Sequence, residues 1–222
     1  MNTKFILIFL KDLEKNNNRD WFLANKGRYE EAKNEFGTFI NEIIPSIAKF
    51  DQEVVNLSAK DCMFRIYNDI RFAKNRPLYK TNMGGYIAKG GKNLGHAGYY
   101  FHLENNNCFI GGGIYMPPAD KLKLIRQEIF YNYKEFSDIL TSKSMQKYFN
   151  QLDDFRTSRV PKDFPKDSES AELLKYKSFT VLCPISQKQL LSADFKTTVV
   201  DIFKTITPLN HFLNRALFVP HG

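Results

Sequence analysis

Cysteine is scarce in this sequence, and the few cysteines present form no recognisable pattern. Cys62, Cys108 and Cys183 lie far apart, without a CxxC pair and without the accompanying histidine spacing of a zinc site. Each lies beside apolar residues of the kind found in strands, so we expect small core residues rather than functional thiols. The odd number and the wide spacing indicate a reducing compartment, which we take to be the cytoplasm.

Long apolar runs are also lacking. No stretch approaches the roughly 20 residues that a membrane-spanning helix needs, so we expect no membrane partner. The apolar run from Phe5 to Leu10 is too short for a secretory signal, is followed by charges, and has no small-residue cleavage pattern. We expect this run to be the buried face of a first helix.

The sequence has none of the short motifs that identify common enzyme classes. HExxH, GxSxG and a paired metal-binding aspartate pattern are missing. The glycines at 111–113 are not followed at once by a helix, as a dinucleotide-binding motif or a P-loop requires. We therefore predict no metal and no cofactor, and the sequence leaves open whether the protein is an enzyme.

Apolar and aromatic residues, by contrast, are plentiful, at 43% and 14% of the chain. This content supports a folded core and argues against disorder, and the length fits one domain, residues 1–222. The chain has 32 basic and 24 acidic residues, and the resulting net charge of +8 favours acidic partners. The basic excess is concentrated between Arg65 and Lys92.

Hydrophobic periodicity predicts an α+β fold. Helical spacing over 19–51 indicates a helical N-terminal third. A period of two then predicts strands near 62–72, 82–88, 98–104 and 108–116, with a fifth strand at 175–185. A helical region precedes the fifth strand, and a C-terminal helical region over 192–218 is expected to break near Pro208. We predict a mostly antiparallel sheet of about five strands with helices packed against it.

The segment RIYNDIRFAKNRPLYKTN, residues 65–82, carries five cationic residues and one acidic residue, Asp69. In an extended strand, Arg65, Asp69 and Arg71 would share a polar face opposite an apolar one. Because one carboxylate cannot neutralise two guanidinium groups, a positive charge remains that could hold a phosphate or carboxylate. The predicted anion-binding residues are Arg65, Asp69, Arg71, Lys74, Tyr79 and Lys80. The alternative is an exposed basic loop with no ligand.

A second cluster lies in the hairpin over 96–116, where aromatic residues face glycines. With a three-residue turn at 105–107, we expect Tyr100 opposite Gly112 and on the same face as His102 and Glu104. The rings either cover bare glycine backbone or leave the glycines open to a ligand. His102 is either structural or an acid–base group. The additional residues that could line a site are Tyr67, Tyr100 and His102.

The cationic segment resembles the signature of an uncharacterised, mainly bacterial family, domain of unknown function 2461. That signature is approximately R-x-x-R-D-x-R-F-x-x-x-K-x-P-Y, and Asn68 stands where it has a second arginine. The residues that match, with slightly altered loop spacing, are Arg65, Asp69, Arg71, Phe72, Lys74, Pro77 and Tyr79. Stretches such as AGYYFHLE and GGGIYMP also resemble family segments in the expected order. The resemblance spans most of the chain, and it implies no known activity, cofactor or catalytic residue.

These features favour an intracellular domain that recognises a phosphate- or carboxylate-bearing small molecule, with Arg65 and Arg71 as clamps. Two other classes remain open. A nucleic-acid-associated basic protein would use the cations for phosphate contacts and the aromatics for stacking, although no recognised motif is present. A non-catalytic protein-interaction module would use the arginine row only for packing. The sequence does not determine the oligomeric state.

Overall fold

The computed structural model describes residues 1–69 and 76–217. Its centre is an antiparallel sheet in which neighbours in sequence are also neighbours in space. The strands, in the order in which they pair, are β1 (Asn82–Ala88), β2 (Gly98–Glu104), β3 (Phe109–Ile114) and β4 (Phe179–Pro184). The predicted α+β class and the mostly antiparallel sheet are confirmed, but the predicted count of about five strands is wrong, since this sheet has four.

The expected strand at 62–72 is the one that the sheet lacks. A short helix, α4 (Ala59–Cys62), occupies its start, and Met63 forms only an isolated bridge with Gly85 of β1. Further along, Tyr67 forms an isolated antiparallel bridge with Tyr79 instead of extending the sheet. The expected alternation also fails in part, because Phe64 is 42% exposed whereas Ile66 is buried. The last part of the predicted strand lies outside the described residues.

The turn between β2 and β3 corrects the predicted register. The amide of Asn107 donates to the Glu104 carbonyl, and Asn106 adopts a φ of 60°. Asparagine tolerates this left-handed conformation better than most residues, so the strands reverse over two central residues rather than three. Tyr100 consequently pairs with Gly111 and not with Gly112. A shift of one residue matters because it changes which glycines share a face with Tyr100.

The N-terminal third is helical, as predicted. It contains α1 (Thr3–Lys15), α2 (Arg19–Ala24) and α3 (Lys26–Ile47), followed by the short 3₁₀ helix η1 (Gln52–Val54). The asparagines between the first two helices satisfy backbone groups at the helix ends: Asn16 ends α1, and the Asn18 side chain accepts a hydrogen bond from the Trp21 amide at the start of α2.

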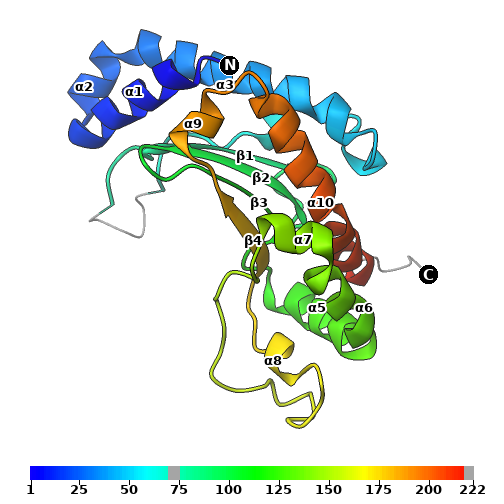
Figure 1. Ribbon diagram of the computed structural model, residues 1–222. Coiled ribbons are helices and arrows are strands. Elements are labelled where there is room, and N and C mark those ends of the chain that lie inside the picture. Colours follow the sequence, from blue (N-terminus) through cyan, green and yellow to red (C-terminus); the bar gives the residue numbers. More distant parts are fainter. Residues whose placement is uncertain (70–75, 218–222) are drawn as a thin grey trace.

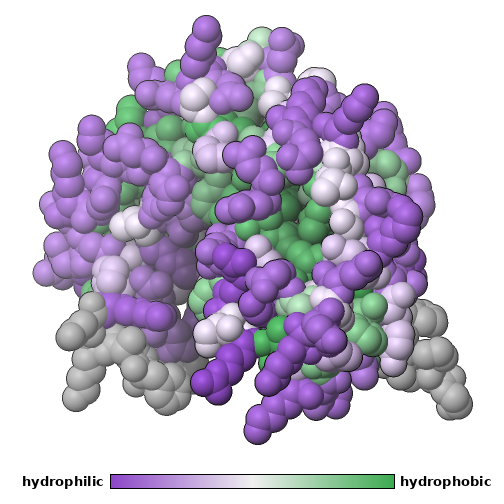
Figure 2. All heavy atoms as spheres, turned by 60° about the horizontal axis from the view of Figure 1, so that its bottom comes forward, coloured by the Kyte–Doolittle hydropathy of each residue, from purple (hydrophilic) through white to green (hydrophobic). Residues whose placement is uncertain are grey.

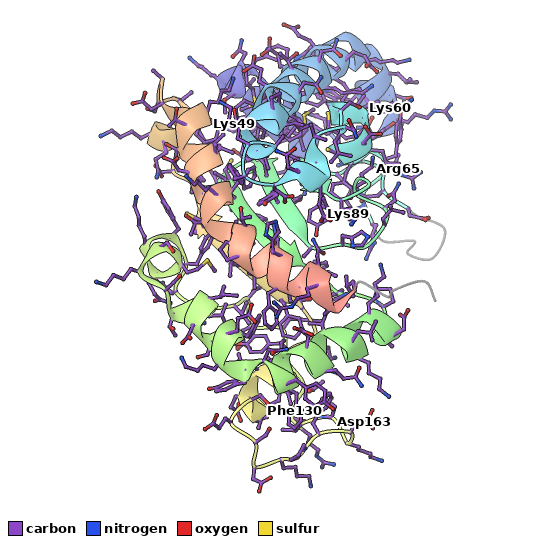
Figure 3. All side chains as sticks on the ribbon, turned by 90° about the vertical axis from the view of Figure 1, so that its right-hand side faces the viewer. Lys49, Lys60, Arg65, Lys89, Phe130 and Asp163 are labelled. Carbon is purple, nitrogen blue, oxygen red and sulfur yellow. The ribbon has the colours of Figure 1, made fainter. Side chains whose placement is uncertain are left out.

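Six helices follow β3 in the described part of the chain. They are α5 (Ala119–Tyr131), α6 (Tyr133–Thr141), α7 (Lys143–Tyr148), α8 (Ala171–Leu174), α9 (Gln187–Leu190) and α10 (Phe195–Ala216). Of these, α5, α6, α7 and α8 lie toward the end away from α1 and α2, α9 lies near α1, and α10 runs between the two ends (Figure 1). The expected break near Pro208 is wrong, because α10 continues through Pro208 to Ala216. Contacts with β3, α3, α5 and α6 hold this helix along its length, which offsets the hydrogen bond that proline cannot make. Figure 3 shows α10 reaching toward the end marked by Phe130 and Asp163.

The long helices α1, α3 and α10 cover one face of the sheet (Figure 1). The core between these layers is strongly aromatic: the Phe101 ring of β2 lies between Phe36 and Phe39 of α3, and Phe39 stacks on Phe195 of α10. Such ring pairs contribute about 0.5–1.5 kcal/mol each beyond the burial of their area. The helices thereby fix the sheet from one side and leave its other face for different contacts.

The cysteines follow the predicted pattern in part. Cys62 and Cys108 are buried, Cys183 is half-buried, and all three are free thiols. Burial raises the pKa of each of these thiols, so that the unreactive protonated form dominates near neutral pH. No helix in the described part of the chain is long and apolar enough to cross a bilayer.

Candidate functional site

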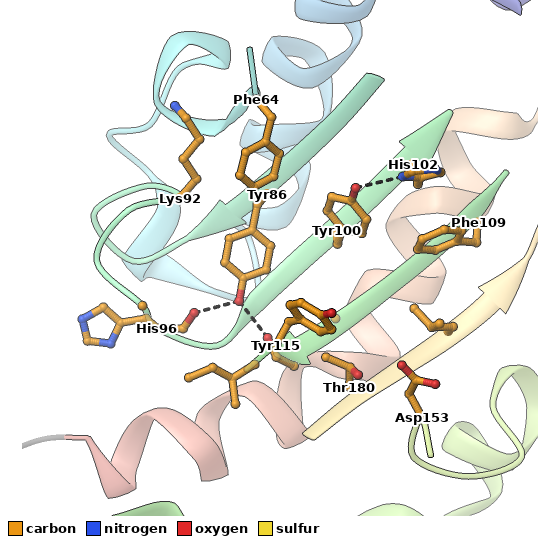
Figure 4. A pocket seen from close by; sticks show the side chains of 15 residues that line it. Phe64, Tyr86, Lys92, His96, Tyr100, His102, Phe109, Tyr115, Asp153 and Thr180 are labelled. Atoms are coloured by element: carbon orange, nitrogen blue, oxygen red, sulfur yellow. Dashed lines mark hydrogen bonds between the residues drawn. The ribbon is translucent and has the colours of Figure 1, made fainter. Parts of the chain in front are cut away.

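The face of the sheet that α3 and α10 do not cover carries a row of aromatic and polar side chains. Alternate residues of a strand point to opposite faces, so residues 100, 102 and 104 of β2 share this open face. Tyr86 of β1 pairs with Tyr100, and Phe109 of β3 pairs with His102, which brings their side chains to the same side. Thr180 and Leu182 of β4 complete the row (Figure 4).

These side chains, apart from that of Glu104, line a cavity of about 470 Å³. Loops close its sides: Phe64 comes from the segment after α4, Lys92 and His96 from the β1–β2 loop, and Asp153 from the segment after α7. The lining residues on the sheet and just beyond it are Tyr86, Tyr100, His102, Phe109, Gly112, Gly113, Ile114, Tyr115, Thr180 and Leu182. Figure 2 shows hydrophobic atoms gathered in a hollow that hydrophilic side chains surround. A pocket of this volume suits a small molecule.

Two glycines determine the shape of the cavity floor. A Cβ on Gly84 would lie 2.7 Å from the Tyr100 hydroxyl oxygen, so the Tyr100 ring rests where a side chain would otherwise be. Gly113 has a φ of +100°, and a Cβ there would lie 1.9 Å from the Phe179 carbonyl oxygen. Only glycine adopts this backbone conformation without strain, and only glycine allows β3 and β4 to approach so closely at this point.

A chain of hydrogen bonds runs along β2 on the cavity floor. The Tyr100 hydroxyl oxygen lies 2.8 Å from His102 Nδ1, and His102 Nε2 lies 3.3 Å from Glu104 Oε2. The His102 ring stacks on Phe109 with 4.4 Å between ring centroids. Thr81 and Asn107 each donate a hydrogen bond to the Glu104 carboxylate, at 3.0 and 2.8 Å. The carboxylate, the imidazole and the phenol are therefore held in one line.

Burial controls the protonation of these groups. Burial lowers the pKa of His102 more than the hydrogen bond to Glu104 and the Glu104 charge raise it, so the imidazole is neutral near pH 7. Burial also raises the pKa of Tyr100 to about 12, and the Glu104 charge contributes to that rise. Burial alone would raise the pKa of Glu104, but the hydrogen bonds from Asn107, His102 and Thr81 hold it below its ordinary value. Glu104 is thus the charged end of the chain.

One buried polar atom on the cavity wall is left without a partner. Within residues 1–69 and 76–217, the Thr180 hydroxyl oxygen has no hydrogen-bond partner, whereas the His96 ring points away from the cavity (Figure 4). Tyr86 is different, because its hydroxyl oxygen lies 2.7 and 2.8 Å from the carbonyl oxygens of His96 and Gly113, which share its single proton. An unsatisfied buried polar group costs about 1–3 kcal/mol. Such groups commonly mark a place where a ligand or an ordered water binds.

Cationic side chains lie beside one wall of the cavity. Lys92 lines it, and its ammonium group donates to the carbonyl oxygens of Lys60 and Asp61. Lys80 Nζ lies 5.5 Å from the ring centroid of Phe64, another lining residue. Burial lowers the pKa of Lys80, and the positive charge of Arg65 lowers it further. Arg65 itself is exposed (Figure 3).

The predicted site residues separate into groups. Tyr100 and His102 line the cavity, whereas Arg65 and Lys80 stand next to its Phe64 wall. Asp69 is half-buried and follows the bridge formed by Tyr67. Arg71 and Lys74 lie outside the described residues.

Tyr67 and Tyr79 occupy a different environment. Both rings pack on Phe22 of α2, and the Tyr79 ring stacks on it with 3.9 Å between centroids. The Asn17 side chain also binds both backbone polar groups of Tyr79. These contacts fasten the segment after residue 75 to the N-terminal helices. Tyr79 is buried as a result.

Sequence reasoning missed several lining residues. Tyr86 and Phe109 lie in strands that the period of two predicts, so their place on the open face follows once the register is known. Thr180 and Asp153 are brought in by β4 and by the segment after α7, which are far from residue 100 in the sequence. Among the described residues, no group of three or more metal-ligating side chains is placed to hold a metal ion.

The fold and the site together define an α+β protein with a ligand-sized, largely aromatic cavity on the open face of an antiparallel sheet. The chain belongs to the family described as "Conserved hypothetical protein (DUF2461)", whose model matches residues 6–212. The chain matches no curated protein and no solved structure.

Proposed function

We propose that the protein binds a small molecule that combines a flat apolar part with a phosphate or carboxylate group, and that the molecule occupies the cavity on the open face of the sheet. The observation that carries the proposal is the combination of aromatic walls with the partnerless Thr180 hydroxyl on the cavity lining.

The apolar part of the ligand fits the aromatic walls. Phe64, Tyr86, Tyr100 and Phe109 present ring surfaces, and the glycine floor lets a flat molecule approach the strand backbone. The Thr180 hydroxyl supplies both a donor and an acceptor to a polar substituent. Ligand pockets in proteins commonly combine apolar walls with a few polar groups that fix orientation, and this cavity has that composition.

The anionic part of the ligand fits the wall beside Phe64. Lys80 Nζ lies 5.5 Å from the Phe64 ring centroid, Arg65 follows Phe64 in the chain, and Lys92 adds a third positive charge on the cavity lining. An anion placed between like charges relieves their repulsion and gains charge-assisted hydrogen bonds. Guanidinium and ammonium groups both bind phosphate and carboxylate, so the charge pattern defines the anionic class rather than one chemical group.

A thermal-shift screen with matched ligand pairs tests the proposal. Phenyl phosphate and benzoate are compared with phenol and benzamide, which keep the ring but lack the anionic charge. A ligand at 100 times its dissociation constant stabilises by about 2.7 kcal/mol, which corresponds to a rise of roughly 5–10 °C in Tm for a chain of this size. We expect larger shifts from the anionic members, and a reduced advantage at high salt.

Two lysine variants separate specific binding from the effect of net charge. Lys80→Gln removes a cation beside the Phe64 wall, whereas Lys188→Gln removes one from α9, away from the cavity. We expect only Lys80→Gln to reduce the advantage of the anionic ligands. Equal responses of the two variants, or equal shifts from charged and neutral ligands, would contradict the anionic part of the proposal.

A further inference from the structure

The side chains of Tyr100, His102 and Glu104 form a connected series because their strand has a period of two. All three lie on the open face, and the two hydrogen bonds between them join a cavity-lining phenol to a carboxylate near the β2–β3 turn. Figure 4 shows the Tyr100 ring beside Tyr86, with its hydroxyl bonded to His102. Structural packing alone requires no such alignment of three ionisable groups.

The hydrogen bonds in this series have a defined direction. An ionised carboxylate only accepts, so His102 Nε2 carries the proton that it donates to Glu104. In the neutral imidazole the other nitrogen, Nδ1, is then an acceptor, and it accepts from the Tyr100 hydroxyl. Because the Tyr100 proton is committed to His102, the remaining lone pairs of the Tyr100 oxygen accept hydrogen bonds. The cavity therefore presents an acceptor at this point and selects ligands with an O–H or N–H group.

We infer that Tyr100 is a catalytic acid–base group that takes the proton from a hydroxyl of the bound small molecule, with His102 and Glu104 as its proton relay. The inference rests on the proposed function, since the hydroxyl belongs to the ligand that the cavity holds. It extends that function from binding to the activation of a hydroxyl group.

The proton transfer balances within the complex. The ligand O–H bond breaks and its proton binds the Tyr100 oxygen, while the original Tyr100 proton moves to His102 Nδ1. The ligand becomes an oxyanion, Tyr100 stays neutral, and His102 becomes an imidazolium ion that keeps its Nε2 proton toward Glu104. No oxidant, reductant or second substrate takes part. General-base steps of this type typically contribute about 10²–10⁴-fold to a rate.

The surroundings of His102 favour Glu104 as the group that stabilises the imidazolium ion. The residues opposite His102 on the neighbouring strands are Gly84 and Phe109, and neither carries a charge. Glu104 and Tyr100 are the ionisable groups that contact the ring. Thr81 and Asn107 hold the carboxylate in place, so its charge is fixed beside Nε2 before a ligand binds.

A ligand whose hydroxyl ionisation can be followed by its absorption spectrum tests the inference. The probe is 4-hydroxy-3-nitrobenzoate, a flat ring with a carboxylate and a hydroxyl whose ionisation changes its absorption spectrum. Its methyl ether, 4-methoxy-3-nitrobenzoate, has no proton to give. Binding of the ether tests the proposed function alone. We expect the hydroxyl compound to bind about two- to tenfold more tightly, as one additional hydrogen bond allows.

The spectrum of the bound probe reports the transfer itself. Because the proton stays in the complex, we expect the ionised fraction of bound probe to remain constant over the pH range in which the free probe titrates. In parallel, ¹⁵N NMR of histidine-labelled protein is expected to show His102 with the proton on Nε2 in the free protein and with protons on both nitrogens in the complex.

Conservative variants separate the relay from a structural role. Tyr100→Phe keeps the ring and removes the oxygen, so both the preference for the hydroxyl compound and its ionisation are expected to disappear. In Glu104→Gln the amide oxygen can still accept from His102 and Asn107, and the amide nitrogen can donate to the Thr81 hydroxyl, while the charge is lost. Binding and preference are therefore expected to remain while the ratio of ionised to neutral probe falls about tenfold or more. Tyr131→Phe and Glu172→Gln, both outside the cavity, are the matched controls.

Each contrary outcome has a distinct meaning. If both compounds bind equally and the bound probe titrates like the free one, the inference fails and the proposed function stands. If neither compound binds, both fail for this class of ligand. A His102 proton on Nδ1 in the free protein overturns the inference without any ligand, because the direction of the hydrogen bonds would then be reversed.

Discussion

Replacing Gly84 with alanine is expected to separate Tyr100 from His102. The new Cβ would lie 2.7 Å from the Tyr100 hydroxyl oxygen and 3.1 and 3.2 Å from two of its ring carbons. Gly84 has an ordinary strand backbone, so an alanine fits the backbone conformation and the strain arises from the clash of its Cβ with Tyr100. Because the ring is rigid, it has to swing away as a unit, and the hydrogen bond to His102 Nδ1 breaks.

The cost of this substitution is the balance of three effects. The lost hydrogen bond destabilises by about 0.5–1.5 kcal/mol, and crowding in a packed region adds about 1–3 kcal/mol. Alanine also lowers the conformational entropy of the unfolded chain, which stabilises the folded state by about 0.4–1 kcal/mol. We therefore expect a net destabilisation of about 0.5–4 kcal/mol, and the midpoint of about 2 kcal/mol corresponds to a fall of roughly 4–8 °C in Tm.

Urea denaturation and histidine ¹⁵N NMR measure the two consequences separately. The control is Gly27→Ala in α3, where a Cβ would meet nothing within 4 Å and where alanine favours the helix. We expect the control to be neutral or slightly stabilising and to leave the His102 signals unchanged. If Gly84→Ala is as stable as the unchanged protein and has the same His102 spectrum, the account of the cavity floor is wrong.

Three further predictions concern the same face of the sheet. Gly113→Ala is expected to prevent stable folding, because its φ of +100° and the carbonyl oxygen 1.9 Å from the new Cβ leave no room for relaxation; circular dichroism of the soluble product measures this. Thr180→Val is expected to leave the ligand-free protein as stable or about 1 kcal/mol more stable in urea, since the hydroxyl has no partner in the described structure, while weakening ligand binding. Burial lowers the pKa of His102 in the folded state, so the unfolded state binds more protons as the pH falls through about 6.5. The free energy of unfolding is therefore expected to decrease as the pH falls through this range, and His102→Gln is expected to make that decrease shallower in urea denaturation.

Local sequence signals predict the elements whose contacts are local. The β2 strand and its neighbours follow from the period of two, and the same period is enough to put Tyr100, His102 and Glu104 on one face of the sheet. The caps at Asn16 and Asn18 follow from the preference of asparagine for helix ends. These features depend on backbone geometry and on neighbours in the chain.

Contacts between distant segments explain what the sequence could not show. Tyr79 looks like a loop hydroxyl, but Phe22 and Asn17 bury it from more than fifty residues away. The segment after Met63 has the alternation of a strand, yet it pairs with its own continuation instead of adding to β1 along its length. Pro208 predicts a break, and packing on both sides of α10 overrides it.

The cavity itself depends on both kinds of information. Its floor follows from strand alternation, but its walls come from Phe64, the β1–β2 loop and the segment that carries Asp153. The charge pattern of the sequence centres the predicted binding site on the cationic segment. In the structure, the described residues Arg65 and Lys80 of that segment border a cavity whose lining is mainly aromatic.

The most direct test of the binding site is to fill it. Leu182 lines the cavity at its β4 edge and is 40% exposed, so Leu182→Trp places an indole in the cavity without disturbing the core. Leu191→Trp makes the same change at an exposed position outside the cavity lining. Isothermal titration calorimetry with the strongest ligand of the phenyl phosphate and benzoate series compares both folded variants with the unchanged protein. The account predicts at least a tenfold loss of affinity in Leu182→Trp alone, whereas unchanged affinity in that variant would contradict it.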